Sequence, residues 1–370
     1  MVRKLAIWLM RQVRSLRRYG QRKLREKAEY GNIKRKQALC QKVCLSQDEK
    51  AQIDSFFVKH YGEKIPYHWH RLYQSYTGTF CKDYFPEILF STRLEPLLSK
   101  RGDAEFLGDK NLLEVLFCNV PGVRVPKTFG SGTRGMIRGK NKTICSREAL
   151  AKELSAIGPC VIKKTVDTNS GRDVMLCDFQ NGVDSHSEKT VLEILHSFGE
   201  DFVVQELVCQ SEALAKINST SVNTFRVISY FCDDALHVCP IALRVGRSGA
   251  DKDNIHYGGI SVGVKPDGAL RKAAFSEFGE AFLAHPDSQI VFEEYKIPGA
   301  EHLANAAKQL HACVPWLKMI SWDLTIDVND RITLIEMNTV GQSAWFPQMV
   351  NGEPLFGRNT PSMLALIRKK

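Results

Sequence analysis

The chain has 370 residues, of which 44% are hydrophobic and 25% are charged, and its net charge is +10. These fractions are typical of a globular protein with two or three domains. The positive charge is concentrated in residues 1–36, which hold thirteen Lys or Arg and two Glu, a net of +11. The other residues therefore carry about −1 in total, which excludes a broad polyanion-binding surface on the body of the protein.

The eleven cysteines are scattered, and they form no C-x-x-C pair and no Cys/His set with zinc spacing. The apolar run Leu5–Met10 is too short for a signal sequence or a membrane span, and no secretory cleavage site follows it. Together these features favour a cytoplasmic protein with reduced thiols.

Residues 2–19 predict one amphipathic helix that ends at Gly20, with Trp8 on the apolar side and arginines on the other. This pattern is typical of a helix that lies in the plane of an anionic membrane surface. Packing on the protein's own body is one alternative, and contact with nucleic acid is another. Because Tyr19 and Tyr30 are the only aromatic residues near the rest of the basic run, we expect no nucleic-acid partner.

Residues 37–108 show helical periodicity with many aromatic side chains, and from about residue 110 strand and helix patterns are mixed. Residues 160–166 predict a strand that carries Lys163 and Lys164, followed by a small polar loop at 167–173 that contains Ser170 and Gly171. Such a loop can lay backbone N–H groups over phosphates while a lysine adds positive charge. An ordinary hairpin turn is the alternative.

Three later segments carry further polar groups. The predicted strand at 202–208 ends near Gln205 and Glu206, which could bind an adenine edge and a ribose. Two further strands carry Arg226 and Arg244, and Asn254 and a Gly-Gly pair follow them. The arginines suit stabilisation of a transferring phosphoryl group, although each alone would more often form a surface ion pair.

Residues 320–326 and 334–338 predict a hairpin with its turn at 328–331. Glu336 and Asn338 are two residues apart on a strand and share one face, and the hairpin brings Asp323 close to them. Oxygen ligands of this kind suit Mg²⁺ bridged to nucleotide phosphates. A half-exposed hairpin with solvated polar residues is the alternative.

The order of these motifs resembles the ATP-grasp superfamily, and most closely the sugar-transfer-associated ATP-grasp family, from about residue 60 to the C-terminus. The resemblance rests on Trp69-His70, Phe106–Asn111, Val203–Glu206, Ser221–Thr224, the two arginines and the hairpin residues. It implies an α+β ATP-grasp fold in which two α+β lobes clasp ATP. The expected divisions are a basic amphipathic tail (1–36), a helical N-terminal region (37–108), a lobe with the phosphate flap (109–204) and a lobe with the metal site (205–370).

The same resemblance implies roles for individual residues. Lys110 and Lys163 hold the nucleotide phosphates, under a flap that includes Ser170 and Gly171. The adenine is lined by Gln205, Glu206, Leu207 and Val208, and Glu206 or Glu212 holds the ribose. Arg226, Arg244 and Asn254 act at the transferring phosphate and the substrate carboxylate, while Asp323, Glu336 and Asn338 carry two Mg²⁺. Many ATP-grasp chains have Lys-Pro where this chain has Lys163-Lys164, and strand register favours Lys163 as the lysine that faces ATP.

By resemblance the expected activity is that of an ATP-dependent carboxylate–amine ligase that forms an acyl phosphate and modifies a cell-surface polysaccharide precursor. Its substrates would be a carboxylate and an amine derived from sugars or amino acids. An ATP-dependent phosphotransferase on the same fold and a non-catalytic nucleotide-binding protein are the alternatives. The expected location is the cytoplasm, with peripheral attachment to the inner membrane face through residues 1–36 as a further expectation.

Overall fold

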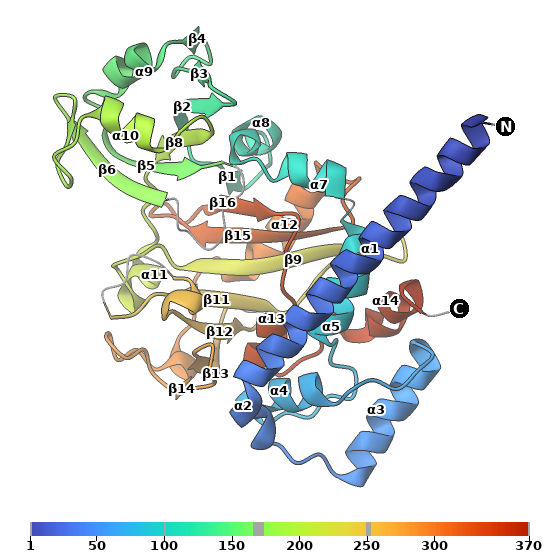
Figure 1. Ribbon diagram of the computed structural model, residues 1–370. Helices are drawn as coiled ribbons and strands as arrows, with labels where there is room; N and C mark the ends of the chain where they lie inside the picture. Colours follow the sequence, from blue (N-terminus) through green and yellow to red (C-terminus); the bar gives the residue numbers. More distant parts are fainter. Residues whose placement is uncertain (1, 100, 166–173, 249–252, 369–370) are drawn as a thin grey trace.

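The computed structural model describes residues 2–99, 101–165, 174–248 and 253–368 (Figure 1). The predicted flap with Ser170 and Gly171 lies outside these residues. The described chain is a mixed α+β fold with a smaller lobe above a larger sheet, and the helical N-terminal region flanks that sheet (Figure 1).

The larger sheet has nine described strands in the order β1-β16-β15-β9-β11-β12-β13-β14, with β10 paired to β9. The pairing of β1 with β16 is parallel, and the other described pairings are antiparallel. Its strands are β1 Val123–Arg124, β9 Thr224–Cys232, β10 Ala235–Val238, β11 Ile241–Val245, β12 Ile260–Val264, β13 Leu270–Phe275, β14 Ala281–Phe282, β15 Met319–Ile326 and β16 Ile332–Asn338. The central strand β15 is buried along its whole length, as expected for a strand covered on both faces.

The smaller lobe holds a seven-stranded antiparallel sheet in the order β4-β3-β2-β8-β5-β6-β7. Helices α9 (Arg147–Leu154) and α10 (Val191–Ser197) pack their apolar residues against one face of it. The strands are β2 Thr128–Thr133, β3 Met136–Arg138, β4 Ile144–Cys145, β5 Gly158–Lys164, β6 Val174–Gln180, β7 Val183–Asp184 and β8 Phe202–Glu206.

The N-terminal region is helical, as its periodicity predicts. It comprises α1 Val2–Arg35, α2 Gln37–Gln41, α3 Gln47–His60, α4 His68–Thr77, α5 Glu87–Leu89, the π-helical turn η1 Phe90–Leu94, α6 Glu95–Leu98 and α7 Arg101–Leu107. The remaining helices are α8 Leu113–Phe117, α11 Glu212–Ile217, α12 Leu303–Ala312, α13 Trp345–Asn351 and α14 Thr360–Leu366. Short 3₁₀ turns occur at Lys110–Leu112, Ile255–Tyr257, Phe292–Glu294, Ala300–His302 and Gly357–Asn359.

The first helix does not end at Gly20, so that prediction is wrong: α1 continues to Arg35. A glycine inside a helix costs only about 1 kcal/mol, and tertiary packing easily offsets this. The packing comes from the second half of α1, where Tyr30 meets the Trp69 ring edge-to-face at 5.7 Å and Ile33 is buried. This half lies against α4, α5 and η1, whereas the first half projects beyond the body (Figure 1).

None of the described helices combines the length and the hydropathy that a transmembrane span requires. On the projecting half of α1, the side chains of Leu16 and Tyr19 are 70% and 61% exposed. Here the described apolar residues are not packed on the protein's own body.

Candidate functional site

The predicted hairpin is formed by β15 and β16. Asp323 lies directly opposite Glu336, and Ser321 lies opposite Asn338. Directly paired residues point to the same face of a sheet, as do residues two apart on one strand. The structure therefore brings Asp323, Glu336 and Asn338 together on one face, and the Asn338 Nδ2 lies 3.4 Å from the Asp323 Oδ2.

Two arginines extend this polar face onto the neighbouring strands. Arg226 on β9 is in register with Asp323 and donates to both of its carboxylate oxygens, at 2.6 and 3.3 Å. Arg244 on β11 reaches Asp323 Oδ2 at 3.0 Å through its Nη2. A carboxylate that is only 3% exposed is thus held between two guanidinium groups.

Asp253, which the sequence reasoning missed, anchors the other side of Arg244. Its Oδ2 lies 3.5 Å from the Arg244 Nε and accepts hydrogen bonds from the backbone N–H and the hydroxyl of Thr224. The neighbouring Asn254 has a local role in this structure, because its Oδ1 accepts the backbone N–H of His256 and caps a 3₁₀ turn. Gly259 allows this turn to close, since a Cβ there would lie 2.5 Å from the Asp253 carbonyl oxygen.

Two lysines approach the polar face from the smaller lobe and the turn that precedes it. The Lys110 Nζ lies 2.9 Å from the Glu336 Oε1. The charges that act on Lys163 are those of Glu336 and Lys110, so this β5 lysine faces the hairpin. Lys164 follows it on the same strand and points to the opposite face.

Burial and neighbouring charges alter the pKa values of these groups in different directions. Burial raises the pKa of the Asp323 carboxyl, but Arg226 and Arg244 outweigh burial and hold it below its ordinary value. For Lys163, burial lowers the pKa to about 8, against the opposing effect of the Glu336 carboxylate and with a further lowering by Lys110. Asp323 is therefore a firmly ionised carboxylate, and Lys163 titrates just above neutral pH.

Residues 205–208, which we call the hinge, begin at the end of β8, where Gln205 and Glu206 point to opposite faces of the strand. Gln205 is paired with Val161, two residues before Lys163, and so lies on the same face as Lys163. Its side chain is buried, and its Nε2 has no hydrogen-bond partner in the described part of the chain. Glu206 is turned to the other face, where its carboxylate pairs with Arg124 and accepts the backbone N–H of Lys127.

The remaining predicted nucleotide residues lie beyond β8. Leu207 and Val208 follow the strand directly, and Val208 is buried. Glu212, the alternative ribose ligand, is at the start of α11 with its side chain 83% exposed and paired with Lys216 at 2.8 Å. Of the two proposed ribose ligands, Glu206 is held more firmly in this structure.

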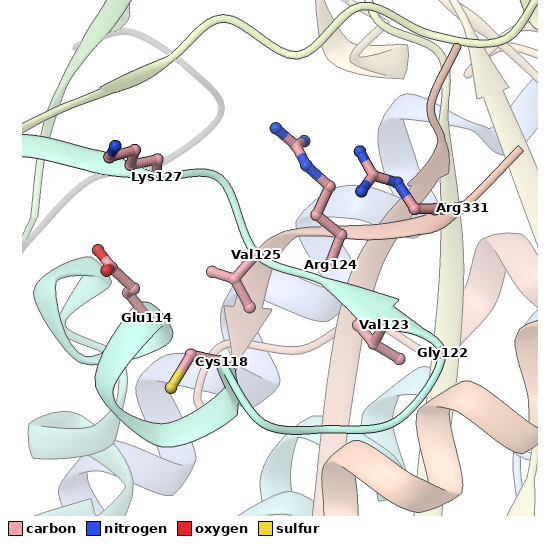
Figure 2. Close-up of a pocket in the computed structure, with 8 residues that line it drawn as sticks. All are labelled: Glu114, Cys118, Gly122, Val123, Arg124, Val125, Lys127 and Arg331. Carbon is pink, nitrogen blue, oxygen red and sulfur yellow. The ribbon is translucent and has the colours of Figure 1, made fainter. Parts of the chain in front are cut away.

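A pocket of about 410 Å³ lies beside the hinge, between α8, β1 and the turn after β15 (Figure 2). Figure 2 shows Arg124 and Arg331 side by side, with Glu114 and Cys118 across from them. Asp327 contacts both guanidinium groups, at 3.8 Å from Arg124 and 3.0 Å from Arg331. Asp323, Glu336 and Asn338 do not line this pocket, so the polar face, and not this pocket, is the centre of the candidate site.

The side-chain oxygens of Asp323, Glu336 and Asn338 suit a divalent cation that the protein and the phosphates of a ligand bind together. They suit a cation bound by protein ligands alone less well. Among the described residues, no group of three His, Cys, Asp or Glu side chains is placed to hold a metal ion. The hairpin offers two carboxylates and one amide, and four cationic side chains surround them. Mg²⁺ is usually bound by one or two carboxylates together with the phosphates of a nucleotide.

Residues 89–362 match the model of the sugar-transfer associated ATP-grasp family. This chain belongs to that family. The predicted family and the predicted α+β ATP-grasp fold are thereby confirmed. No curated protein sequence matches the chain.

Several solved structures are distantly similar to this family member. They include N5-carboxyaminoimidazole synthetase from Staphylococcus aureus complexed with ADP (8% identity, TM-score 0.42, covering 71% of this chain and 52% of that one). The ATP-grasp ligase PsnB complexed with its minimal precursor is 12% identical, with a TM-score of 0.42 and coverage of 72% and 64%. VanG D-Ala:D-Ser ligase from Enterococcus faecalis is 14% identical, with a TM-score of 0.39 and coverage of 74% and 62%. In each case the match spans less than two thirds of the solved chain, and the family assignment rests on the family model.

Proposed function

We propose that this protein is an ATP-dependent carboxylate–amine ligase. The observation that carries the proposal is the polar face on which Asp323, Glu336 and Asn338 lie with Arg226 and Arg244. Lys110 and Lys163 approach the same face. Such a concentration of cations and oxygen donors suits the transfer of a phosphoryl group, which depends on positioning and charge neutralisation.

The residues of this face divide into a nucleotide set and a substrate set. Lys110 and Lys163 contact the phosphates of ATP, and the unpartnered amide of Gln205 and the following hinge residues receive the adenosine. Glu336, Asn338 and Asp323 would hold Mg²⁺, which would supply neutralisation of phosphate charge. Arg226 and Arg244, which contact Asp323, would bind the transferring phosphoryl group and the substrate carboxylate.

In the proposed reaction a carboxylate oxygen attacks the γ-phosphorus of ATP, and the bond to the β–γ bridging oxygen breaks. This gives an acyl phosphate and ADP. The amine nitrogen then attacks the acyl carbon, the carbon–oxygen bond breaks, phosphate leaves and the amine loses a proton. The cations supply charge stabilisation in the first step, and exclusion of water protects the acyl phosphate before the second.

The family's association with sugar transfer supports a sugar-derived carboxylate, carried by a nucleotide sugar or a lipid-linked glycan, as the substrate class. We further propose that the projecting half of α1 binds an anionic membrane surface and keeps the enzyme near lipid-linked substrates. The exposed Leu16 and Tyr19 on a basic helix support this attachment.

The test is mass spectrometry of the products formed from ATP and Mg²⁺ with uronate-bearing nucleotide sugars or lipid-linked glycans and a set of amino acids. We expect ADP, phosphate and an amide whose mass is the sum of carboxylate and amine minus water. A stable phosphorylated product with no amide would contradict the ligase proposal and identify a phosphotransferase.

A further inference from the structure

Residues 339–344, which we call the post-strand segment, directly follow β16, the strand that carries Glu336 and Asn338. Two buried carboxyl groups of the helical N-terminal region bind the backbone of this segment. Glu95 accepts the backbone N–H of Gln342 at 2.7 Å. Glu87 accepts the backbone N–H of Ala344 with both oxygens, at 3.2 and 2.9 Å. The backbone of this segment is thus bound by side chains that lie about 250 residues earlier in the sequence.

The post-strand segment is in turn bonded to the hairpin. The side-chain oxygen of Gln342 accepts the hydroxyl of Ser321 at 2.6 Å, and Ser321 lies opposite Asn338 in the β15–β16 pairing. Thr339, the residue next to Asn338, donates its hydroxyl to the carbonyl of Ala104 at 2.6 Å. The position of the segment therefore affects the end of the strand that carries Glu336 and Asn338.

Arg25 on α1 and Lys36, just after α1, contact residues that bind or adjoin this segment. Arg25 on α1 donates to the carbonyl of Ser91 at 2.5 Å and lies 3.2 Å from the Glu95 Oε2. Lys36, just after α1, lies 3.6 Å from the ring centroid of Trp345, the residue that follows the segment, and 3.6 Å from the Glu277 Oε1. The second half of α1 thereby supports the segment through Glu95, and Lys36 flanks the C-terminal end of the segment.

Carboxylates in such positions are costly unless they are paired. Burial raises the pKa of Glu95, while the N–H of Gln342 and the charge of Arg25 oppose this rise. Burial raises the pKa of Glu87 well above its ordinary value, and the N–H of Ala344 again opposes it. Apolar side chains would hold α5, η1 and α6 together at a lower free-energy cost than buried carboxyl groups do. We therefore explain Glu87 and Glu95 by the backbone N–H groups that they orient.

We propose that Glu87, Glu95 and Arg25 are positioning residues for the metal-ligand strand, so that α1 is part of the apparatus that binds the Mg²⁺-nucleotide. This inference rests on the nucleotide site proposed above. Groups that orient metal ligands from behind change metal affinity without touching the metal.

The test is calorimetric binding of ADP to the full chain, once with saturating Mg²⁺ and once with a chelator. Arg25→Met should weaken MgADP binding by about tenfold, the lower end of losses seen when residues behind metal ligands are changed. Binding of ADP without Mg²⁺ should stay within about twofold, because Lys110 and Lys163 lie outside the segment, on the turn Lys110–Leu112 and on β5. A purely structural role for Arg25 would weaken both forms equally or neither.

The matched control is Arg22→Met. Arg22 lies on the same helix, its side chain is 38% exposed against 37% for Arg25, and its ion pair is with Glu26 on the same helix. This variant should bind MgADP like the unmodified protein.

Glu95→Gln keeps an acceptor for the N–H of Gln342 but removes the ion pair, and it provides a second variant if Arg25→Met folds poorly. Glu95→Gln alone should show the same Mg²⁺-specific loss, and the double variant should be no weaker than the worse single variant. Strictly additive losses, or losses equal with and without Mg²⁺, would overturn the inference. Failure of the unmodified protein to bind MgADP would instead contradict the proposed function.

Discussion

Asp323 and Glu336 are both proposed metal ligands, but their surroundings differ. Asp323 is buried between Arg226 and Arg244, whereas the Glu336 side chain is 32% exposed and pairs with Lys110. Removing the charge of Asp323 would leave two guanidinium groups without their shared partner. A substitution at Asp323 therefore tests stability as well as metal binding, and one at Glu336 tests metal binding more cleanly.

Glu336→Gln should abolish Mg²⁺-dependent ADP release while changing the unfolding midpoint less than a substitution at Asp323, because a charged oxygen ligand is lost from a partly exposed position. Asp323→Asn should abolish turnover as well but also destabilise the fold by about 3–5 kcal/mol, as expected when one partner of a buried ion pair is removed. Steady-state ADP release and urea unfolding measure the two effects. Near-normal ADP release by Glu336→Gln at saturating Mg²⁺ would show that the metal assignment is wrong.

Lys163→Ala should weaken ATP binding more than Lys164→Ala. Lys163 faces Glu336 and Lys110, and alternate residues of a strand point to opposite faces. Equilibrium titration with ATP measures both variants, and each serves as the control for the other. Equal losses, or a larger loss for Lys164→Ala, would mean that the proposed phosphate side of β5 is wrong by one residue.

Nucleotide affinity should depend on pH through Lys163. Its pKa is about 8 without nucleotide because burial favours the neutral amine, and bound phosphates favour the charged form and so raise this pKa. Affinity should therefore be nearly constant below the free pKa and fall as the pH rises above it. At about pH 9, calorimetry in buffers of different ionisation enthalpy should show proton uptake on ADP binding. Lys163→Arg should abolish this uptake, and an uptake that persists in this variant would assign it to another group.

The β15–β16 hairpin could be predicted from the sequence because its signals are local. Alternation with period two sets which residues share a face, and Val328–Arg331 contains turn-forming residues. The convergence of Arg226 and Arg244 on Asp323 could not be predicted from local signals, because it depends on the strand order β15-β9-β11. Glu87 and Glu95 were missed for a related reason: an isolated glutamate in a helical pattern indicates a solvated surface position.

The long helix α1 shows how packing overrides a local stop signal. Gly20 is a reasonable end for a helix by propensity, but contacts made by residues 25–36 stabilise a continuous helix. Residues 25–36 therefore pack on the body of the protein, although the predicted division places them in the basic tail (1–36).

Two truncations separate these parts of α1. Deletion of residues 1–18 should abolish co-sedimentation with anionic vesicles but leave MgADP affinity within about twofold, because the described contacts to the body begin later in the helix. Deletion of residues 1–36 removes Arg25, buried Ile33 and buried Lys36, and should lower both stability and MgADP affinity. If the shorter truncation and the full chain sediment equally with vesicles, the projecting half does not bind membrane.

The charge of this protein is divided between a basic helix and a nearly neutral body. The body concentrates its functional charges on one face of the large sheet, where the smaller lobe adds Lys163. Family membership and this face together support phosphoryl transfer from ATP as the central chemistry. The acyl phosphate is the species that distinguishes a ligase from the phosphotransferase alternative.

Hydroxylamine trapping tests this chemistry most directly. The full chain is incubated with ATP, Mg²⁺, hydroxylamine and each uronate-bearing candidate, without any other amine, and the products are analysed for ADP and an acyl hydroxamate. We predict that a hydroxamate forms in amounts equal to the ADP released, that it requires both ATP and the carboxylate, and that it is absent with Glu336→Gln. ADP released together with a stable phosphorylated product and no hydroxamate would contradict the proposal that this protein is a carboxylate–amine ligase.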